Sequence, residues 1–293
     1  MTEMNDGSGG SATGVVAGSA SPRVGFIGLG SQGGPIARRI IDSGFSTTLW
    51  ARRKESLEPY VDTTAAIADS RAALGAQSDI VGICVDNDAA VEEVLTGPAG
   101  VLSGMASGSV VVIHSTIHPA TCRRLRDVAR EKGVDLIDAP VSGGGEAAAE
   151  QRLLVMVGGP ADVLDRCRRV LECFADPLLH LGEVGAGQVT KLLNNTLLAA
   201  NFGAAMAFLD LGRSLGVDVQ SLAAVISNGS GASYALSVLE RTGGAVGALA
   251  EQAEPLLRKD IGLLRDLAEG VDSKEGVAWA LAREAIDRMA AAR

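Results

Sequence analysis

Six residues near the start of the chain have the types and spacing of a dinucleotide-binding turn. The segment Gly28-Leu29-Gly30-Ser31-Gln32-Gly33 fits the pattern G-x-G-x-x-G, and it lies between the β-like run Val24–Ile27 and a helical stretch. The first glycine permits a tight turn, the second lets backbone N–H groups approach a pyrophosphate, and the third allows close helix–strand packing. The helix N-terminus adds partial positive charge for the phosphates. A purely structural glycine turn is the alternative, but the strand–turn–helix context favours a dinucleotide site.

Two arginines follow the second predicted strand, Thr47–Trp50, where a dinucleotide site meets the adenosine ribose. A site for NAD usually carries Asp or Glu there, about 20 residues beyond the glycines, to bind the ribose 2′-hydroxyl. This chain has Ala51, then Arg52 and Arg53. Because a guanidinium fork suits a 2′-phosphate, the segment predicts that NADP is preferred and that NAD remains possible. A solvated basic turn is the alternative reading of the two arginines.

Lys191 and Asn195 are candidates for proton transfer and substrate binding. They are four residues apart on a predicted helix, so they share one face of it. Lys191 lies near the start of that helix, where the helix dipole and desolvation both lower the pKa of a lysine. A lysine lowered towards neutrality can accept a hydroxyl proton. Taken alone, an exposed helix lysine would be the simpler interpretation.

The elements that must position these residues alternate between strand and helix as far as residue 185. Further predicted strands are Ile80–Val85, Val110–Ile113, Val134–Asp138, Leu153–Val157 and Leu178–Leu181, with helices at Pro35–Ser43, Ala120–Lys132 and Ala161–Cys173. This alternation predicts an α/β fold with a parallel, doubly wound Rossmann sheet. Helical segments follow at Gln188–Leu215, Val219–Ser227, Ala235–Arg241, Pro255–Ala268 and Lys274–Ala291. We therefore predict a disordered extension over residues 1–21, a Rossmann dinucleotide-binding domain over 22–185, and a helical substrate and dimerisation domain over 186–293.

Several motifs, in the same order along the chain, resemble those of the β-hydroxyacid dehydrogenase family. That family includes 3-hydroxyisobutyrate dehydrogenase and tartronate semialdehyde reductase, with 6-phosphogluconate dehydrogenase a more distant relative. The motifs are Gly25-Phe26-Ile27-Gly28-Leu29-Gly30, Ser115-Thr116-Ile117-His118-Pro119, Asp138-Ala139-Pro140-Val141-Ser142-Gly143-Gly144, Met156-Val157-Gly158-Gly159, Gly185-Ala186-Gly187 with Lys191-Leu192-Leu193-Asn194-Asn195, and Lys259-Asp260. The resemblance runs from Arg23 to the C-terminus, and six motifs in the family's order are far more specific than one.

This resemblance implies a reaction and a set of site residues. It implies NAD(P)-linked, reversible oxidation of a small 3-hydroxyacid in a cleft between the two domains. Lys191 would be the catalytic acid/base, and Asn195 with the Ser142-Gly143-Gly144 loop would hold the substrate carboxylate and hydroxyl. Thr116, Lys259 and the loop that starts at Val85-Asp86 would lie beside the cofactor, and Arg52 matches the arginine that follows the second strand in NADP-using relatives.

The chain departs from the family pattern at a few positions. Gln32 replaces the usual Met of the glycine turn, and Asp86 stands where the family often has Pro. Ala147 and Gln151 occupy positions at which many relatives carry glycine. The last two changes lie close to the predicted substrate loop, so they bear on which substrate is bound more than on the type of reaction.

Composition excludes some classes of function. The 293 residues include 26 basic and 35 acidic side chains, and this net charge of −9 argues against non-specific nucleic-acid binding. The four cysteines form no C-x-x-C pair, and free thiols in a reducing cytosol are favoured over a disulfide. The first 20 residues do not have the pattern of a secretory signal, and the longest apolar stretch, Leu192–Leu211, is interrupted by polar residues. We therefore expect a cytoplasmic protein with no membrane span, and the surplus apolar surface of the long helix suggests a homodimer or homotetramer.

Other functions remain as alternatives. An imine reductase shares the expected architecture, but such enzymes typically lack the lysine at the position of Lys191. A non-catalytic nucleotide-binding scaffold is a second alternative, and retention of both Lys191 and Asn195 counts against it. His114, His118 and Cys122 are spaced by four like metal ligands on a helix, but Pro119 breaks any shared helix, so no metal site is expected.

Overall fold

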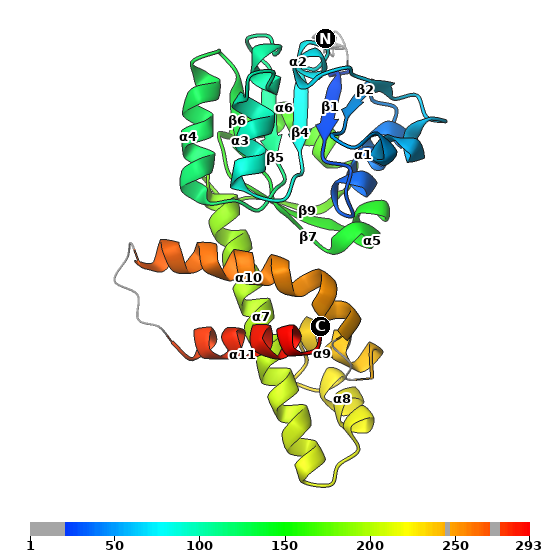
Figure 1. The fold of residues 1–293 in the computed structure, drawn as a ribbon, viewed down its shortest axis with the longest axis vertical. Helices are drawn as coiled ribbons and strands as arrows, with labels where there is room; N and C mark the ends of the chain where they lie inside the picture. The colour runs from blue at the N-terminus through cyan, green and yellow to red at the C-terminus, as the bar shows by residue number, and fades with distance from the viewer. Residues whose placement is uncertain (1–20, 244–246, 270–275) are drawn as a thin grey trace, which may run out of the picture.

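The structure, a computed structural model, describes residues 21–243, 247–269 and 276–293, so residues 1–20 of the predicted disordered extension lie outside it. The chain forms an α/β part and a helical part (Figure 1). Helix α7 (Ala186–Ser214) leaves the α/β part and forms the central helix of the other. Figure 1 shows helix α10 (Gly247–Glu269) running beneath the α/β part, so the two parts face each other across this helix.

Six strands form one parallel sheet in the order β3-β2-β1-β4-β5-β6. The strands are β1 (Val24–Ile27), β2 (Thr47–Trp50), β3 (Ala66–Ile67), β4 (Ile80–Ile83), β5 (Val110–Ile113) and β6 (Asp135–Asp138). Strand β1 pairs with β2 on one side and with β4 on the other, so the strand order reverses between β1 and β4. In such sheets ligands bind outside the carboxyl ends of the strands at this reversal. The predicted parallel Rossmann sheet is thus confirmed.

Helices cover both faces of the sheet because its central strands are apolar throughout. Strands β1, β4 and β5 are buried at every position, as expected for strands enclosed on both faces. Helices α1 (Gly33–Asp42) and α6 (Ala161–Leu171) pack on one face. Helices α2 (Arg71–Ala76), α3 (Asp88–Thr96) and α4 (Pro119–Arg130) pack on the other, and the connections carry the 3-10 helices η1 (Lys54–Tyr60) and η2 (Val101–Ser103).

The later strands do not extend the main sheet as the continued alternation suggested. Strands β7 (Val141–Ser142), β8 (Leu153–Val157) and β9 (Ala175–His180) form a separate sheet in the order β7-β8-β9. The β7–β8 pair is antiparallel, and only the short helix α5 (Gly144–Ala149) connects these two strands. Such a short connection returns the chain antiparallel, because a parallel crossover needs a dozen or more residues. This small sheet places the Ser142-Gly143-Gly144 loop beside the helical part.

Within the described residues, four helices pack around α7 in the second part. Helices α8 (Val219–Ser227), α9 (Tyr234–Arg241), α10 and α11 (Val277–Ala291) all contact it, and they share an apolar core with it. Helix α10 begins eight residues before the predicted start at Pro255, which lies inside the helix. Pro255 has the residue type of a first helical position, but the preceding turns are stabilised by packing, since Ala250 is fully buried. Part of the predicted segment Lys274–Ala291 lies outside the described residues.

Helix α7 is long and apolar enough to cross a membrane by length and composition alone. The mean hydropathy of its most apolar 18-residue stretch is 1.3. The expectation that polar residues make this helix too polar to span a membrane is therefore not met by its hydropathy. However, 56% of that stretch is buried inside the fold, and α10 and α11 pack along the helix. A buried core helix of a globular protein passes the same test, and this is the position α7 has here.

Candidate active site

Three connected hollows lie along the carboxyl ends of the main sheet and continue towards α7. The arginine recess, about 170 Å³, contains Arg52, Arg53 and Gly28. The glycine-loop recess, about 230 Å³, contains the backbone of residues 30–33 together with Lys191. The helix cleft, about 530 Å³, contains the Ser142-Gly143-Gly144 loop and Lys191 again. Neighbouring hollows share lining residues, so an extended ligand can reach from the two arginines to Lys191.

Two glycines of the turn are required because the packing leaves no room for a β-carbon, and the third faces open space. Gly28 has φ +98°, and a β-carbon on it would lie 1.9 Å from the carbonyl oxygen of Cys84. A β-carbon on Gly33 would lie 2.0 Å from the carbonyl oxygen of Gly28. In contrast, nothing lies within 4 Å of a β-carbon on Gly30. The backbone at Gly30 is therefore open to a ligand, and these residues fit the diphosphate of a dinucleotide at the start of α1.

Arg52 and Arg53 are both exposed and both line the arginine recess. A third arginine, which the sequence reasoning missed, lines the same recess. The Arg71 guanidinium carbon lies 5.4 Å from the centroid of the Trp50 ring, and its Nη1 donates to Glu93 Oε1 over 2.9 Å. Arg71 comes from α2, so only the folding of β2 against α2 brings these three guanidinium groups to one hollow.

Lys191 lies where the glycine-loop recess and the helix cleft meet, and it lines both. Its side chain is buried in the second turn of α7, and Gly187 and Gln188 in the first turn are buried as well. Burial lowers the pKa of Lys191 to about 8, the charge of Asp260 opposes this shift, and the charge of Lys259 adds to it. A group with a pKa close to the operating pH is suited to both accept and donate a proton.

A polar network from three elements surrounds Lys191. Asn195, one turn further along α7, donates through Nδ2 to Asp260 Oδ2 over 2.6 Å. Lys259 Nζ donates to the carbonyl oxygen of Thr116 over 2.6 Å and lies 3.2 Å from Asp260 Oδ1. The structure thus brings Thr116, Lys259 and Asn195 together beside Lys191. The sequence marks Asp260 only as part of a motif and does not predict it as a site residue, because its partner Asn195 is distant in sequence.

Two further residues missed as site residues hold the first turn of α7. Asp138, at the end of β6, accepts a hydrogen bond from Gly185 N over 2.6 Å and one from Gln188 N over 2.8 Å. The Gln188 side chain accepts from Ile117 N and donates to the carbonyl oxygen of Ser115. Asp138 therefore ties the helix that carries Lys191 to the sheet, and Gln188 ties it to the loop after β5. Burial raises the pKa of Asp138 to about 6, against the effect of its backbone hydrogen bonds.

The predicted substrate loop borders the helix cleft. Gly143 and Gly144 have φ of +131° and +79°, and a β-carbon on Gly143 would lie 2.7 Å from that of Ala147. Glycine is needed at these positions because other residues rarely adopt such backbone angles. Ser142 lines the same cleft, and it pairs with Leu154 in the small sheet. The loop can present a hydroxyl and backbone groups to an anionic ligand.

Gln32 lies between the two hollows, like Lys191. It lines both the glycine-loop recess and the helix cleft, and its Nε2 atom is buried without a hydrogen-bond partner. Buried donors without a partner are uncommon. The sequence predicts Gln32 only beside the cofactor, whereas in the structure it also borders the helix cleft. Val85 and Asp86, also predicted beside the cofactor, line the glycine-loop and arginine recesses.

Of the histidines and cysteines, His114 and Cys84 line the glycine-loop recess. His114 is buried, its Nδ1 lies 2.9 Å from the carbonyl oxygen of Ala139, and burial lowers its pKa to about 4. The side chain of His118 caps α4 by accepting from Ala120 N. Cys122 is buried in α4, and all four cysteines have free thiols. Among the described residues, no group of three potential ligands could hold a metal ion.

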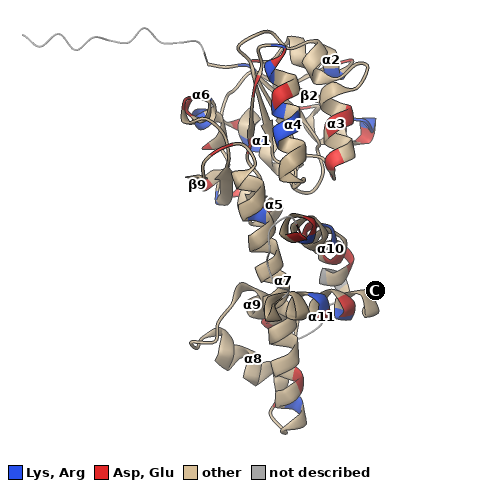
Figure 2. Cartoon of the chain, turned by 90° about the vertical axis from the view of Figure 1, so that its left-hand side faces the viewer, with Lys and Arg blue, Asp and Glu red and all other residues tan. Residues whose placement is uncertain are grey.

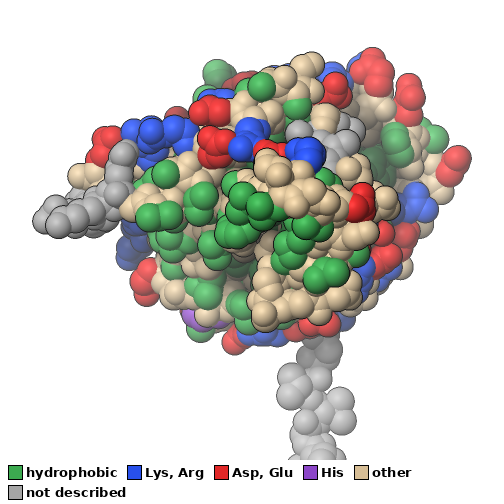
Figure 3. Space-filling model, turned by 90° about the horizontal axis from the view of Figure 1, so that it is seen from below, with side chains coloured by type: hydrophobic (Ala, Val, Ile, Leu, Met, Phe, Trp, Pro, Cys, Tyr) green, Lys and Arg blue, Asp and Glu red, His purple; other side chains and the backbone are tan. Residues whose placement is uncertain are grey.

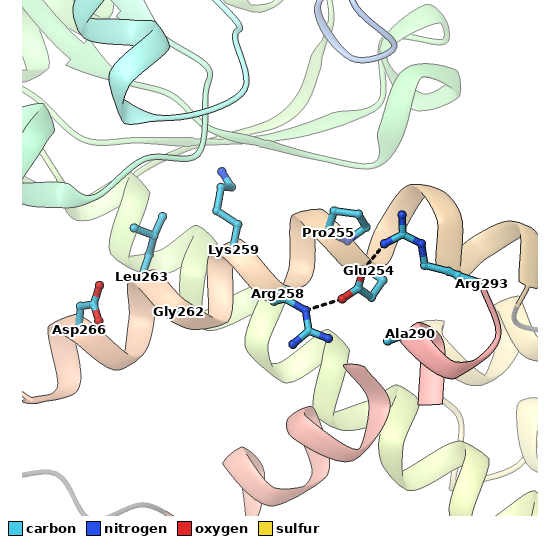
Figure 4. Close-up of a pocket in the computed structure, with 9 residues that line it drawn as sticks. All are labelled: Glu254, Pro255, Arg258, Lys259, Gly262, Leu263, Asp266, Ala290 and Arg293. Carbon is cyan, nitrogen blue, oxygen red and sulfur yellow. Dashed lines mark hydrogen bonds and ion pairs between the residues drawn. The ribbon is translucent and has the colours of Figure 1, made fainter. Parts of the chain in front are cut away.

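A wider hollow of about 810 Å³ lies between α10 and α11, away from the glycine turn. Arg258 and Arg293 converge there on the buried carboxylate of Glu254, whereas Lys259 points out of the hollow towards the α/β part (Figure 4). This hollow contains neither Lys191 nor the substrate loop. Its main feature is the ion pair that holds the chain end against α10, so we assign the chemistry to the three connected hollows.

Comparisons with known proteins agree with this geometry. Residues 23–184 match the NAD-binding domain of 6-phosphogluconate dehydrogenase, and residues 185–293 match the NAD-binding domain of NADP-dependent 3-hydroxyisobutyrate dehydrogenase. The chain is 34% identical over 216 residues to 2-(hydroxymethyl)glutarate dehydrogenase of Eubacterium barkeri, covering 74% of this chain and 72% of that protein.

Solved structures show the same likeness. The structure of Mycobacterium tuberculosis 3-hydroxyisobutyrate dehydrogenase with L-serine has a TM-score of 0.80 and 27% identity, covering 92% of this chain and 94% of that one. Psf3 in complex with NADP+ and 2-OPP has a TM-score of 0.79 and 28% identity, covering 92% and 93%. An imine reductase from Pseudomonas sp., at 19% identity and a TM-score of 0.63, covers 92% and 95% and shares the fold.

These matches extend over both parts of the chain, and the glycine turn and the polar network around Lys191 occupy the hollow where a dinucleotide and a small acid would meet. The chain is therefore an NAD(P)-dependent oxidoreductase that belongs to the 3-hydroxyisobutyrate dehydrogenase-like family of the 6-phosphogluconate dehydrogenase superfamily, whose substrates are small hydroxyacids.

Proposed function

We propose that this chain catalyses reversible hydride transfer between a small 3-hydroxyacid and its semialdehyde or oxo-acid, with Lys191 as the general acid/base. The observation that carries the proposal is the position of Lys191. It is buried at the junction of the cofactor and substrate hollows, with a pKa lowered to about 8. A nicotinamide dinucleotide, which the glycine turn and the arginine recess would hold, would supply the hydride acceptor for oxidation and the hydride donor for reduction.

The residues of this chain account for the proton. In the direction of oxidation, the neutral Lys191 amine accepts the substrate hydroxyl proton as the hydride leaves, so an alcohol becomes a carbonyl group and the amine becomes an ammonium. In the direction of reduction, the ammonium returns that proton to the carbonyl oxygen. Asn195 is fixed by Asp260 and so presents its amide at a set position beside Lys191. Ser142, Gln32 and the backbone of the loop at Gly143 supply donors for the substrate carboxylate.

The test compares Lys191→Met with Lys132→Met. Methionine keeps most of the side-chain volume of lysine and removes the amine. Lys132 is an exposed lysine outside the three hollows, so it serves as the control. Substrates to assay are 3-hydroxyisobutyrate, L-serine and 2-(hydroxymethyl)glutarate, which the names of the related proteins suggest, together with a cyclic imine. We expect Lys191→Met to lower kcat about 10²–10⁴-fold with little change in cofactor binding. Retention of more than half of the wild-type kcat would refute the role of Lys191.

Asn195→Ala tests the substrate side of the same proposal. Asn195 is hydrogen-bonded to Asp260 and lines the helix cleft as well as the glycine-loop recess. Its loss should weaken binding of the acid more than binding of the dinucleotide. Equal losses for both ligands, measured as KM for the acid and Kd for the dinucleotide, would contradict a substrate role.

The cofactor preference is a further part of the proposal. One recess is lined by Arg52, Arg53 and Arg71. Ala51 stands at the strand end where an NAD site would carry an acidic residue. The charges of the three arginines favour the 2′-phosphate of NADP, and the related Psf3 binds NADP+. We therefore infer that NADP is preferred over NAD.

A further inference from the structure

Arg152 is a charged residue of the helix cleft to which the proposed reaction assigns no role. It comes directly before β8, in which Leu153 is fully buried, while Arg152 and Leu154 line the cleft. Successive side chains of an extended segment point to opposite faces. The chain entering β8 therefore directs Arg152 and Leu154 to the cleft and Leu153 to the core.

The pairing of β7 with β8 places Arg152 beside the predicted substrate loop. Ser142 is opposite Leu154 in this antiparallel pair, so the residues that follow Ser142 run alongside those that precede Leu154. A β-carbon on Gly143 would lie 3.9 Å from the carbonyl oxygen of Arg152. The side chain of Arg152 thus starts next to the loop, at the side of the cleft formed by the small sheet.

The backbone before Arg152 is held in an uncommon conformation. Gln151 has φ +58°, which is the left-handed region that residues other than glycine rarely adopt. Its side chain accepts from Arg39 Nη2 over 3.0 Å and donates to the carbonyl oxygen of Glu172 over 2.6 Å. These two contacts hold the turn in a conformation that a non-glycine residue otherwise avoids, and the turn fixes where Arg152 enters the cleft.

The charge and size of the cleft suit a ligand with two negative groups. Its lining residues, all within the described part of the chain, include two cations, Lys191 and Arg152, and no carboxylate. The volume of about 530 Å³ is in the range of sites for much larger ligands than a three- or four-carbon acid. Arg152 is paired with Glu150 in the free protein, and its side chain is 62% exposed, so it can turn from Glu150 to a ligand.

We propose that Arg152 binds a second anionic group at the far end of the substrate, so that this site prefers 3-hydroxyacids with two negatively charged groups. The inference rests on the proposed function for the reacting end of the substrate. The carboxylate nearer to the carbinol carbon is held by the loop at Ser142 and Gly143, and the more distant anionic group is held by Arg152. Glu150 competes with this distal anion for the same guanidinium group.

The experiment uses 3-hydroxypropionates with a substituent at C2 that ends in a carboxylate, a primary amide or a methyl group at equal chain length. With wild-type protein, kcat/KM for the carboxylate should exceed that for the other two about tenfold, since a partly exposed charged hydrogen bond is worth about 1.4 kcal/mol, or a factor of ten. Arg152→Gln should remove this preference, and Arg152→Lys should keep part of it. Glu150→Gln should increase it by removing the competing carboxylate.

The matched control is Arg168→Gln. Arg168 donates through Nε and Nη2 to a single oxygen of Asp165, as Arg152 does to Glu150, but it lies on α6 outside the cleft. The control should leave the preference unchanged. A wild-type protein that uses the three substrates equally, or a preference that survives in Arg152→Gln, would overturn the assignment of Arg152.

A binding measurement separates this inference from the proposed function. Calorimetry with NADP+ present compares glutarate with pentanoate, two unreactive acids of equal length with two charges and one. Tighter binding of glutarate that Arg152→Gln abolishes supports the inference even if no hydroxyacid is turned over, and equal binding overturns it. If monoanionic hydroxyacids are oxidised with dependence on Lys191 but dianions have no advantage, the proposed function stands and the role of Arg152 fails.

Discussion

At the scale of single residues, the protonation of Lys191 makes a pH dependence predictable. Oxidation needs the neutral amine, so its kcat/KM should rise about tenfold per pH unit below pH 8 and level off above it, because the pKa of Lys191 is lowered to about 8. Reduction needs the ammonium, so its rate should fall as the pH rises through the same value. Rates measured in both directions from pH 6 to 10 test this.

A variant at Asp260 gives this profile a control. The charge of Asp260 raises the pKa of Lys191 against the effect of burial, so Asp260→Asn should move the midpoint to lower pH. A midpoint that stays in place, or that moves to higher pH, would show that another group controls the profile.

The cofactor preference also depends on single side chains. A charged hydrogen bond between Arg52 and the 2′-phosphate contributes roughly 1.5–3 kcal/mol, which corresponds to roughly a 10- to 100-fold preference for NADP. Exposure of Arg52 to solvent and salt favours the low end of this range. Arg52→Ala should narrow the difference in kcat/KM between the two dinucleotides. Equal kcat/KM values for the two dinucleotides in wild type, or an unchanged difference in the variant, would show that Arg52 does not bind the 2′-phosphate. Arg71→Ala would test in the same way the arginine that only the folded structure brings to this recess.

At the scale of elements, the start of α7 depends on one buried carboxylate. Asp138 accepts two backbone N–H bonds, from Gly185 and Gln188, and an amide in its place could accept only through one oxygen. Asp138→Asn should therefore lower the free energy of unfolding by about 1–3 kcal/mol. Asp135→Asn, on the same strand but half-exposed and paired with Arg166, should change it by less than about 0.5 kcal/mol. Denaturant unfolding at pH 7 measures both.

The pH dependence of stability has a definite sign at Asp138. Burial raises its pKa from 3.8 to about 6, so between these values the native state binds more protons at this site than the unfolded state. Protonation of this carboxyl group therefore adds an increment of stability that is complete below pH 4 and is lost as the pH rises through 6, whereas the two backbone hydrogen bonds to the carboxylate remain above that pH. Asp138→Asn should remove this slope, and an identical slope in wild type and variant would assign it to other groups.

At the scale of the whole molecule, the helical part has an apolar surface that the fold leaves uncovered. Between Lys191 and Asp210, α7 carries no charged side chain (Figure 2). Seen from below, apolar side chains gather over the helical part with charged groups mostly around them (Figure 3). Exposed apolar residues of α7 to α9 and their connections include Leu193, Leu197, Phe208, Leu211, Leu215, Val225 and Tyr234. Exposed apolar surface of this extent is typical of a subunit interface.

We therefore predict that the chain self-associates through this face, as a homodimer or homotetramer. Phe208 is 64% exposed on α7, and Phe208→Glu should weaken association at least tenfold because a charge would be buried in an apolar interface. Leu179→Glu, on β9 in the α/β part and 46% exposed, is the control and should leave it unchanged. Sedimentation equilibrium measures both, and a monomeric wild-type protein would refute the prediction.

The sequence by itself determined the class of the fold and the positions of most elements. Apolar four-residue runs, glycine spacing and helical periodicity act locally, so they marked β1, β2, β5 and the turn at Gly28 before any contact was known. The sequence also predicted that Lys191 and Asn195 lie on the same side of a helix, because residues four apart on a helix share a face. What these local signals could not give was the separate sheet of β7, β8 and β9, since strand pairing is decided by which faces can be buried together.

Only the tertiary structure decided which distant side chains complete the candidate site. Asp138, Gln188, Arg71 and Asp260 act through partners that lie 22 to 73 residues away in the chain, and nothing in their immediate sequence records those contacts. The lowered pKa of Lys191 has the same origin. Its main cause is burial between the α/β part and α10, and burial is a property of the assembled fold rather than of any segment.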